Sequence, residues 1–507
     1  MLGRDPKKTE LMLKPFIATT QEAAAANAGR APSVRWALAS LSLSMLLASL
    51  GTSIANVALP TLAQAFSASF QQVQWIVLAY LLAITTLIVS VGRLGDLTGR
   101  RRLLLAGLLL FTLASSLCGI APTLPLLIAA RAAQGLGAAI MMALTMAFVG
   151  ETVPKAKTGS AMGLLGTMSA IGTALGPSLG GVLIAGFGWR AIFLVSVPLG
   201  MLTFMLAYRY LPVDRRAPGV DKADRAGKAG KAGFDPLGTL LLALTLAAYA
   251  LAVTMGRGSF GPLNIALLLA ALFGAGLFIL AETRAVSPLI RLAMFRDPVL
   301  GGSLATSALV STVMMATLVV GPFYLSRALG LEAALVGLVL SVGPLVAALT
   351  GVPAGRVVDR FGAQRMTIIG LIGMAAGCSI LSMLPATLGI AGYIAPIALT
   401  TVGYALFQTA NNTAVMADIR PEQRGVISGM LNLARNLGLI TGASVMGAVF
   451  AFASATVDIT AAHPAAVASG MRLTFLVAAM LVVVALAIAV ASRAFAQRHS
   501  RPGPLLP

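Results

Sequence analysis

The sequence is poor in acids, cysteine and histidine. Its 507 residues hold 16 Asp and Glu against 36 Lys and Arg, which gives a net charge of +20 at pH 7. Only 10% of the residues are charged and 58% are hydrophobic, which excludes an ordinary soluble domain and is typical of a polytopic membrane protein. The two cysteines, Cys118 and Cys378, each lie inside an apolar run, so we predict no disulfide and interpret both as packing residues.

With two histidines and few acids, the chain offers little for catalysis or metal binding. We expect no catalytic residue, metal site or cofactor, and we expect that the protein is not an enzyme. A Gly-x-Ser-x-Gly pattern at 176–180 lies inside an apolar run, and a Gly-x-Gly-x-x-Gly pattern at 256–261 follows no strand, so neither has the context that its chemistry requires. Nucleic acid is not an expected partner, because Lys and Arg cluster at the ends of apolar runs.

Fourteen apolar runs are long enough to cross about 30 Å of hydrocarbon. They cover roughly residues 36–59, 75–94, 103–121, 125–150, 159–186, 190–210, 236–255, 263–281, 299–325, 333–354, 366–384, 390–416, 425–452 and 471–492. Thirty of the 36 Lys and Arg residues fall in the two tails and in alternate loops. The positive-inside rule therefore predicts a multi-pass protein of the cell inner membrane with both termini in the cytoplasm.

The chain contains a long internal repeat. GRLGDLTGRRR at 92–102 returns as GRVVDRFGAQR at 355–365, and five glycines between 159 and 181 recur with the same spacing between 425 and 447. Such duplication predicts an all-α fold of two homologous six-helix bundles, with a transport path at their interface. We divide the chain into a tail (1–35), a first bundle (36–211), a linker (212–233), two inserted helices (234–298), a second bundle (299–492) and a tail (493–507).

The repeated loop carries an acid between glycines. Asp96 and Asp359 can accept hydrogen bonds from arginines or from a helix N-terminus across the bundle interface, which would latch one conformation. The alternative is a basic loop that only sets topology; the recurrence of the acid favours the latch. We interpret the arginines at 100–102 as orientation signals and lipid contacts more than as latch partners. The predicted latch comprises Gly92, Arg93, Asp96, Gly99, Arg102, Gly355, Asp359, Gly362 and Arg365.

Small residues form a stripe on the run 159–186. One helix face carries three of the four glycines Gly172, Gly176, Gly180 and Gly181, and a neighbouring helix can approach there. Pro177 is expected to bend the span. We interpret this face as a gate, with ordinary small-residue packing as the alternative. Methionines between 141 and 168 and at 314–315 are interpreted as packing residues, although an adaptable drug-binding wall is the alternative.

Two arginines lie well inside apolar runs. A charge at such depth is costly unless it faces a cavity or a partner, and we expect both Arg131 and Arg435 to face a cavity. An arginine bonded to helix carbonyls is the alternative. The polar residues of the predicted substrate or ion path are Thr52, Ser53, Asn56, Gln134, Gln408, Asn411 and Asn432.

Together these motifs resemble the major facilitator superfamily and its fourteen-span drug/proton antiporter branch. The repeated loop resembles the superfamily's loop 2–3 signature, LIAARAAQGLGAA (127–139) its fourth-span motif, and GTALGPSLGG (172–181) its exporter motif. NVALP (56–60), WIVLAY (75–80) and GWRAIFLVSVPLG (188–200) are similar to the fourteen-span branch. The resemblance implies two six-helix bundles, alternating access and export of a small organic compound.

One position departs from this family. Fourteen-span antiporters commonly carry an Asp in the first span where this sequence has Gly51, so the proton carrier that the resemblance implies is absent. Glu151 and Asp418, near the cytoplasmic mouth, are the alternative carriers that we predict. A proton-driven exporter of a drug or metabolite is the favoured function, against a facilitator or importer without tight proton coupling, or a receptor or scaffold. The expected partners are a small-molecule substrate, protons and the lipid bilayer, and a periplasmic adaptor is left open.

Overall fold

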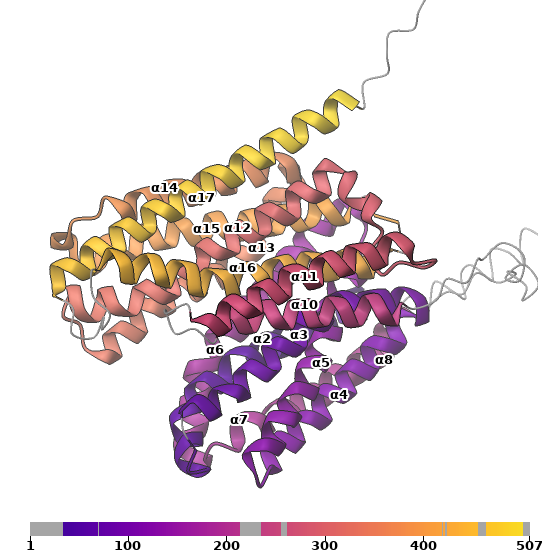
Figure 1. Ribbon diagram of the computed structural model, residues 1–507, viewed down its shortest axis with the longest axis horizontal. Coiled ribbons are helices and arrows are strands. Elements are labelled where there is room, and N and C mark those ends of the chain that lie inside the picture. The colour runs from indigo at the N-terminus through magenta and orange to yellow at the C-terminus, as the bar shows by residue number, and fades with distance from the viewer. Residues whose placement is uncertain are drawn as a thin grey trace, which may run out of the picture.

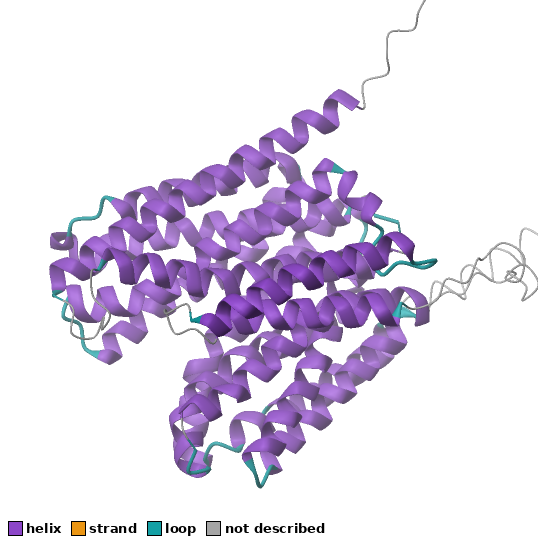
Figure 2. Cartoon of the chain, viewed as in Figure 1, coloured by secondary structure: helices purple, strands orange, loops and turns teal. Residues whose placement is uncertain are grey.

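The computed structural model describes residues 34–68, 70–212, 235–254, 261–417, 419–420, 423–454 and 463–499. In these residues the regular structure is helical, which is how a lipid-embedded chain satisfies its backbone hydrogen bonds (Figure 2). Thirteen helices of the described chain are long and apolar enough to cross a membrane. A fourteenth span results when the two parts of one helix, Lys155–Gly176 and Ser178–Phe187, are counted together across a 41° bend. The prediction of an all-α polytopic fold is thus confirmed, and the bend falls where the sequence has Pro177.

The helices follow the expected order of spans. The first six spans are α2 (Val34–Ala65), α3 (Phe70–Thr98), α4 (Arg100–Ile120), α5 (Leu124–Thr152), α6 (Thr158–Phe187) and the pair α7 (Ala191–Leu194) with α8 (Ser196–Tyr210). Then come α10 (Pro236–Thr254) and α11 (Pro262–Arg284). The last six are α12 (Pro298–Phe323), α13 (Ala333–Phe361), α14 (Ala363–Ser382), α15 (Gly389–Met416), α16 (Arg424–Ala453) and α17 (Pro464–His499). Helix α17 continues past the expected boundary at residue 492, so part of the supposed tail is helical.

The helices form two arms. We call α2–α8 the N-terminal bundle and α12–α17 the C-terminal bundle. Figure 1 shows them side by side at one end and diverging toward the other, with α10 and α11 along their flank. Helix α10 packs on α3 and α16, one helix from each bundle. We call the end where the bundles meet the basic end; it contains the segments 93–102, 151–158, 285–297 and 356–365.

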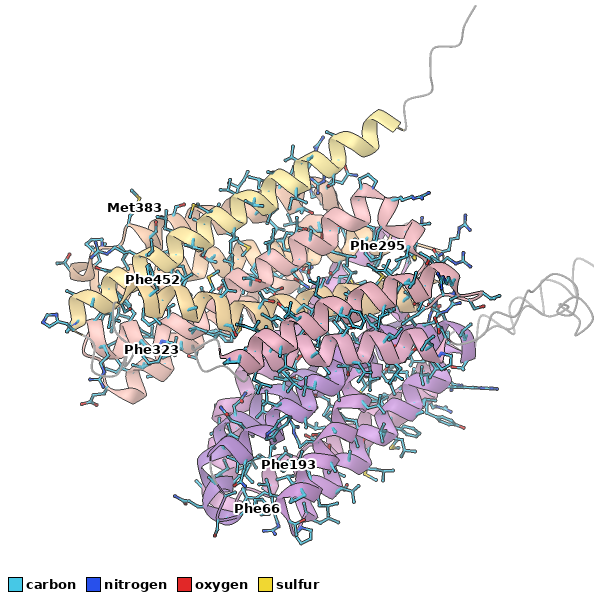
Figure 3. All side chains as sticks on the ribbon, viewed as in Figure 1. Phe66, Phe193, Phe295, Phe323, Met383 and Phe452 are labelled. Atoms are coloured by element: carbon cyan, nitrogen blue, oxygen red, sulfur yellow. The ribbon has the colours of Figure 1, made fainter. Side chains whose placement is uncertain are left out.

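Each bundle has its own apolar interior. In the N-terminal bundle Trp189 packs on the rings of Phe66 and Phe193, with centroids 5.4 and 6.4 Å apart. Figure 3 places Phe66 and Phe193 at the far end of this arm, away from Phe295 at the basic end. In the C-terminal bundle Phe323 packs on buried Phe450 at 5.9 Å. Because lipid tails are as apolar as these side chains, close packing rather than escape from water holds such helices together.

Candidate functional site

The first repeated loop contacts the opposite bundle through Asp96. Its carboxylate, at the end of α3, accepts the backbone N–H of Gly425 at 3.0 Å and that of Val426 at 3.1 Å. These are unpaired N–H groups of the first turn of α16, where the helix dipole favours a negative charge. The end of α3 is therefore joined to the start of α16 across the bundle interface.

The second repeated loop makes the reciprocal contact. Asp359, near the end of α13, accepts the N–H of Gly159 at 2.7 Å and that of Ser160 at 2.8 Å, in the first turn of α6. The hydroxyl of Ser160 donates to the same carboxylate at 2.5 Å. Each bundle thus supplies one acid and one helix N-terminus, so the two contacts are related by the internal repeat.

The two contacts differ in their third donor. Asp96 is also bound by Arg100, whose Nη2 lies 2.7 Å from Oδ1 and whose Nε lies 3.1 Å from it. Arg100 also pairs with Glu151 at the end of α5. The interpretation of Arg100 as a lipid-facing orientation signal is therefore wrong, because its side chain is 7% exposed and is held by two acids. In the second loop Ala363 occupies the position of Arg100, and the Ser160 hydroxyl takes the donor's place.

Glycines allow the backbones to meet at both contacts. A Cβ added to Gly92 would overlap the carbonyl oxygen of Gly425, and one added to Gly425 would overlap that of Gly92. At the second contact a Cβ on Gly355 would lie 2.5 Å from the carbonyl oxygen of Gly159. No side chain fits at these crossings, so a larger residue there would separate the bundles at the basic end.

The remaining residues of the predicted latch lie around these contacts. Gly99 and Gly362 take φ of 105° and 87° between consecutive helices, a conformation that favours glycine. Arg102 and Arg365 are exposed and lie outside the Asp96 and Asp359 contacts. Arg93 lines a cavity of about 210 Å³ together with residues of the loop 285–297 and the start of α16.

Further polar contacts join α16 to α5 of the other bundle. The hydroxyl of Ser428 donates to the carbonyl of Ala143, and Asn432 Nδ2 lies 3.5 Å from the carbonyl oxygen of Met142 and 3.2 Å from Sδ of Met146. Asn432, a predicted path residue, is 3% exposed and forms part of the closed interface. Ser428 was missed from the sequence, since a serine inside an apolar run gives no signal about its partner.

Arg131 does not face a cavity in this structure. Its side chain is 0% exposed, and its guanidinium donates to the carbonyl oxygens of Ile76 and Gly51, both at 3.0 Å, and to Oε1 of Gln134 at 2.5 Å. The guanidinium also lies 4.1 Å from the ring centre of Tyr80. The expectation of a cavity-facing Arg131 is replaced by its alternative, an arginine that ties α5 to α2 and α3 inside one bundle.

Gly51, the position of the missing acid, is part of this network. Its carbonyl receives Arg131, and a Cβ added to it would lie 2.8 Å from the hydroxyl oxygen of Tyr80. Gln134 in turn donates to Oγ of Ser115 at 2.7 Å. The backbone carbonyl of Gly51 thus binds the guanidinium of Arg131. An acid at position 51 would be expected to pair with the same guanidinium.

The glycine stripe of α6 packs within the N-terminal bundle. A Cβ added to Gly172 would lie 2.5 Å from the carbonyl oxygen of Leu46, and Gly176 and Gly180 face Ser53 and Ile54 of the same helix, α2. Ser53 Oγ donates to the carbonyl of Gly172 at 3.1 Å. A Cβ on Gly181 would meet nothing within 4 Å, so Gly181 does not belong to this contact.

The other predicted path residues differ in burial and in hydrogen bonding. Arg435 Nε and Gln408 Oε1 are buried without a hydrogen-bond partner. Asn56 is exposed and donates to the carbonyl of Thr52, itself half-buried, while Asn411 is 3% exposed and donates to the carbonyl of Ser303 at 3.3 Å. No hydrogen bond joins Asn56, Gln408 and Arg435 to one another in the described residues.

Glu151, one of the two alternative proton carriers, is not buried in this structure. Glu151 is a surface partner of Arg100, with 29% of its side chain exposed. Asp418 lies outside the described residues. Among the residues that the structure describes, no group of three or more His, Cys, Asp or Glu could hold a metal ion.

Comparison with known proteins identifies relatives over most of the chain. A family model described as the Major Facilitator Superfamily matches residues 41–443. The multidrug resistance protein Stp of Mycobacterium tuberculosis is 32% identical over 409 residues, which are 80% of this chain and 74% of Stp. The riboflavin transporter RibZ of Clostridioides difficile is 30% identical over 407 residues, 80% of this chain and 86% of RibZ.

A solved structure shows the same fold at lower identity. The human organic anion transporter MFSD10 matches with a TM-score of 0.61 and 15% identity, covering 90% of this chain and all of that one. At this identity the similarity shows the fold alone. Together with the family match, it accounts for the two-bundle architecture.

Proposed function

We propose that this chain, which belongs to the major facilitator superfamily, exports a small organic compound across the inner membrane by alternating access, driven by the proton gradient. The reciprocal Asp96 and Asp359 contacts are the observation that carries this proposal. A site between two bundles opens to one side at a time if the interface closes at one end through contacts that can break. Hydrogen bonds to helix ends are contacts of this kind, because both partners can be hydrated again when the bundles separate.

The basic end is the cytoplasmic end in this proposal. Thirty of the 36 Lys and Arg residues belong to the tails and alternate loops that this orientation places inside. The conformation described here is then closed to the cytoplasm. An exporter in this state must break both latches before it can bind substrate from the cytoplasm.

The substrate class is proposed from relatives and from unused polar groups. Stp is named a multidrug resistance protein and RibZ a riboflavin transporter, so both act on small organic compounds or confer resistance to them. In this chain Arg435 Nε and Gln408 Oε1 are buried donor and acceptor atoms that lack partners. A carbonyl or anionic group on the substrate would satisfy Arg435, and an N–H or O–H group would satisfy Gln408.

Gly51 favours a second candidate, a facilitator or importer without tight proton coupling. The guanidinium of Arg131 is bound by the backbone carbonyl at this position, and no acid replaces the missing one there. Uptake of candidate compounds into inverted membrane vesicles, with and without an uncoupler, separates the two. Export driven by protons gives accumulation that an uncoupler abolishes, whereas a facilitator equilibrates the compound at a rate that the uncoupler leaves unchanged. Vesicles without the protein are the control, and no difference from them for any compound would contradict both.

A further inference from the structure

Two acids of the inserted helices each leave one oxygen without a partner. Asp235 caps α10 with Oδ1, which accepts the N–H of Gly238 at 2.8 Å. Glu282, in the last turn of α11, is 4% exposed, and its Oε2 accepts the N–H of Ile290 at 3.3 Å. Asp235 Oδ2 and Glu282 Oε1 are both buried and have no hydrogen-bond donor.

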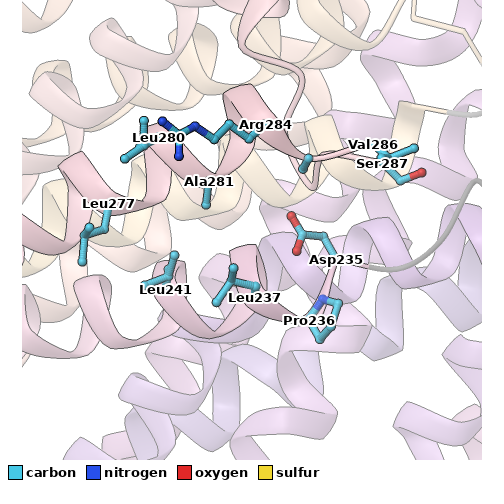
Figure 4. Close-up of a pocket in the computed structure, with 11 residues that line it drawn as sticks. Asp235, Pro236, Leu237, Leu241, Leu277, Leu280, Ala281, Arg284, Val286 and Ser287 are labelled. Carbon is cyan, nitrogen blue, oxygen red and sulfur yellow. The ribbon is translucent and has the colours of Figure 1, made fainter.

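These two oxygens face the same space. A Cβ placed on Gly238 would lie 2.5 Å from Asp235 Oδ2 and 2.7 Å from Glu282 Oε1. Figure 4 shows Asp235 beside Pro236, with its carboxylate directed toward α11. A glycine at 238 therefore leaves room for two carboxylates that approach one another from two helices.

Two ionised carboxylates in this arrangement would repel each other, and each bare oxygen would remain without a donor. A single proton reduces both costs, because it neutralises one acid and gives it an O–H donor directed into the space that the other carboxylate shares. We propose that Asp235 and Glu282 bind one proton between them, and that this proton holds the loop 285–297 against the latch of Asp96.

None of the charged groups around Asp235 and Glu282 takes the place of this proton. Those on the packed elements are Arg93 and Asp96 of α3, Arg284 of α11, Arg291, Arg296 and Asp297 of the loop, and Arg424 and Arg435 of α16, of which Arg435 lies about three turns further along that helix. Arg93 and Asp235 are the charges that act on Glu282. Arg284 lines a cavity of about 700 Å³ with Asp235, but Figure 4 shows its guanidinium directed away from that carboxylate. None of these cations donates a hydrogen bond to either bare oxygen.

The pair is connected to the latch through the loop that Glu282 holds. Leu289, next to the bonded Ile290, lines the cavity of about 210 Å³ that also contains Arg93 and Val426. The N–H of Val426 is one of the donors to Asp96. Loss of the proton would charge both acids, push α10 and α11 apart at this end and loosen the loop beside the latch.

The site can be tested without a known substrate. Infrared titration of the purified protein in liposomes, from about pH 5 to about pH 9, follows the C=O stretch of protonated carboxyl groups. We expect the wild type to lose one such signal as the pH rises, and Asp235→Asn and Glu282→Gln each to remove it, because an amide N–H replaces the proton as donor. Asp297→Asn is the matched control: Asp297 also precedes a proline and caps a helix, accepting the N–H of Val299 at 2.9 Å, but it is exposed.

Thermal unfolding gives an independent readout. Stability from the shared proton is present at low pH and lost as pH rises, so the unfolding midpoint of the wild type should fall with pH more steeply than that of Glu282→Gln. An infrared signal that both variants retain would overturn the proposal. The same unfolding measurement is made in choline buffer and in buffer where sodium or magnesium replaces choline. If the metal cation stabilised the wild type but not Glu282→Gln, the proposal would also be overturned, since the occupant would then be a cation. Neither measurement involves transport, so failure of the proposed function leaves the inference standing.

Discussion

The carboxylate of Asp96 accepts the N–H of Gly425 at 3.0 Å, although the two residues lie 329 positions apart and in different bundles. Asp359 and Gly159 repeat this relationship at 2.7 Å across 200 positions. In both cases an acid of one bundle lies on the N-terminus of a helix of the other, where the helix dipole and free N–H groups favour it. The closed end of the interface is therefore held at two equivalent places.

Neutralising Asp96 should open the basic end. In Asp96→Asn the side chain loses its charge, and the bonds to α16 and Arg100 lose about 1.5–3 kcal/mol, enough to shift a two-state population roughly tenfold or more. Spin labels at the exposed positions Arg102 and Arg365 report the distance between the loops of the two bundles. In Asp96→Asn, a larger fraction of the molecules should show a longer distance between the two labels. Asp297→Asn, a cap within one bundle, should leave the distribution unchanged; an identical distribution in both variants would remove Asp96 from the latch.

The two latches should differ in their dependence on the third donor. Arg100→Ala leaves an almost buried carboxylate with two N–H donors and should cost about 3 kcal/mol or more of unfolding free energy. Ser160→Ala removes one hydroxyl bond and should cost about 1–2 kcal/mol. In a double-mutant cycle Arg100→Ala should cost much less when combined with Asp96→Asn, because the buried charge is gone. Additive costs would mean that Arg100 acts mainly through Glu151.

The crossing of α3 and α16 should not tolerate a methyl group. Gly92→Ala would overlap the carbonyl of Gly425 and should destabilise the closed interface by about 1–3 kcal/mol or more. The control is Gly181→Ala, where the added carbon meets nothing within 4 Å. The labelled pair at 102 and 365 provides the measurement, and equal behaviour of the two variants would contradict the close crossing.

Substitution of Arg131 should act first on the free energy of unfolding, and on transport only through it. Arg131→Ala removes the side-chain donor that the carbonyls of Gly51 and Ile76 share with their own helices, and it opens a cavity, which together should cost about 3–5 kcal/mol. Arg131→Lys should recover only part of this loss, because one ammonium cannot reproduce the planar fork that binds three acceptors. Thermal unfolding in detergent measures both, with exposed Arg102→Ala as the control. A wild-type midpoint in Arg131→Ala would return Arg131 to the transport path.

Restoring the missing acid should introduce proton dependence. The carboxylate of Gly51→Asp would stand beside Arg131 and Tyr80, with the Tyr80 hydroxyl displaced from its 2.8 Å approach. We expect uptake by inverted vesicles to become more steeply pH-dependent in Gly51→Asp than in the wild type. Gly51→Asn has the same shape without the charge and should keep the wild-type profile. Equal profiles in all three proteins would place position 51 away from the ion path.

Much of the fold could be predicted from the sequence. Run length and charge asymmetry depend on local composition, so hydropathy alone predicts the spans and the repeat predicts two bundles. Helix ends were less certain, as α17 shows by continuing to His499, because an amphipathic end can extend beyond the hydrocarbon without penalty. The latch acids could also be located, since an acid between glycines recurs in both loops.

The sequence by itself determined that Asp96 and Asp359 need a donor, that Arg131 is too deep to remain unpaired, and that Gly51 supplies no acid. Only the tertiary structure decided the partners: backbone N–H groups of Gly425 and Gly159 for the acids, and the carbonyls of Gly51 and Ile76 for Arg131. The physical reason is that every residue carries a backbone donor and acceptor, so side-chain identity says nothing about which peptide group a distant helix will present. The burial of Arg100 and the proximity of Asp235 to Glu282 were also decided only by the tertiary structure, because both arise from packing between segments far apart in the chain.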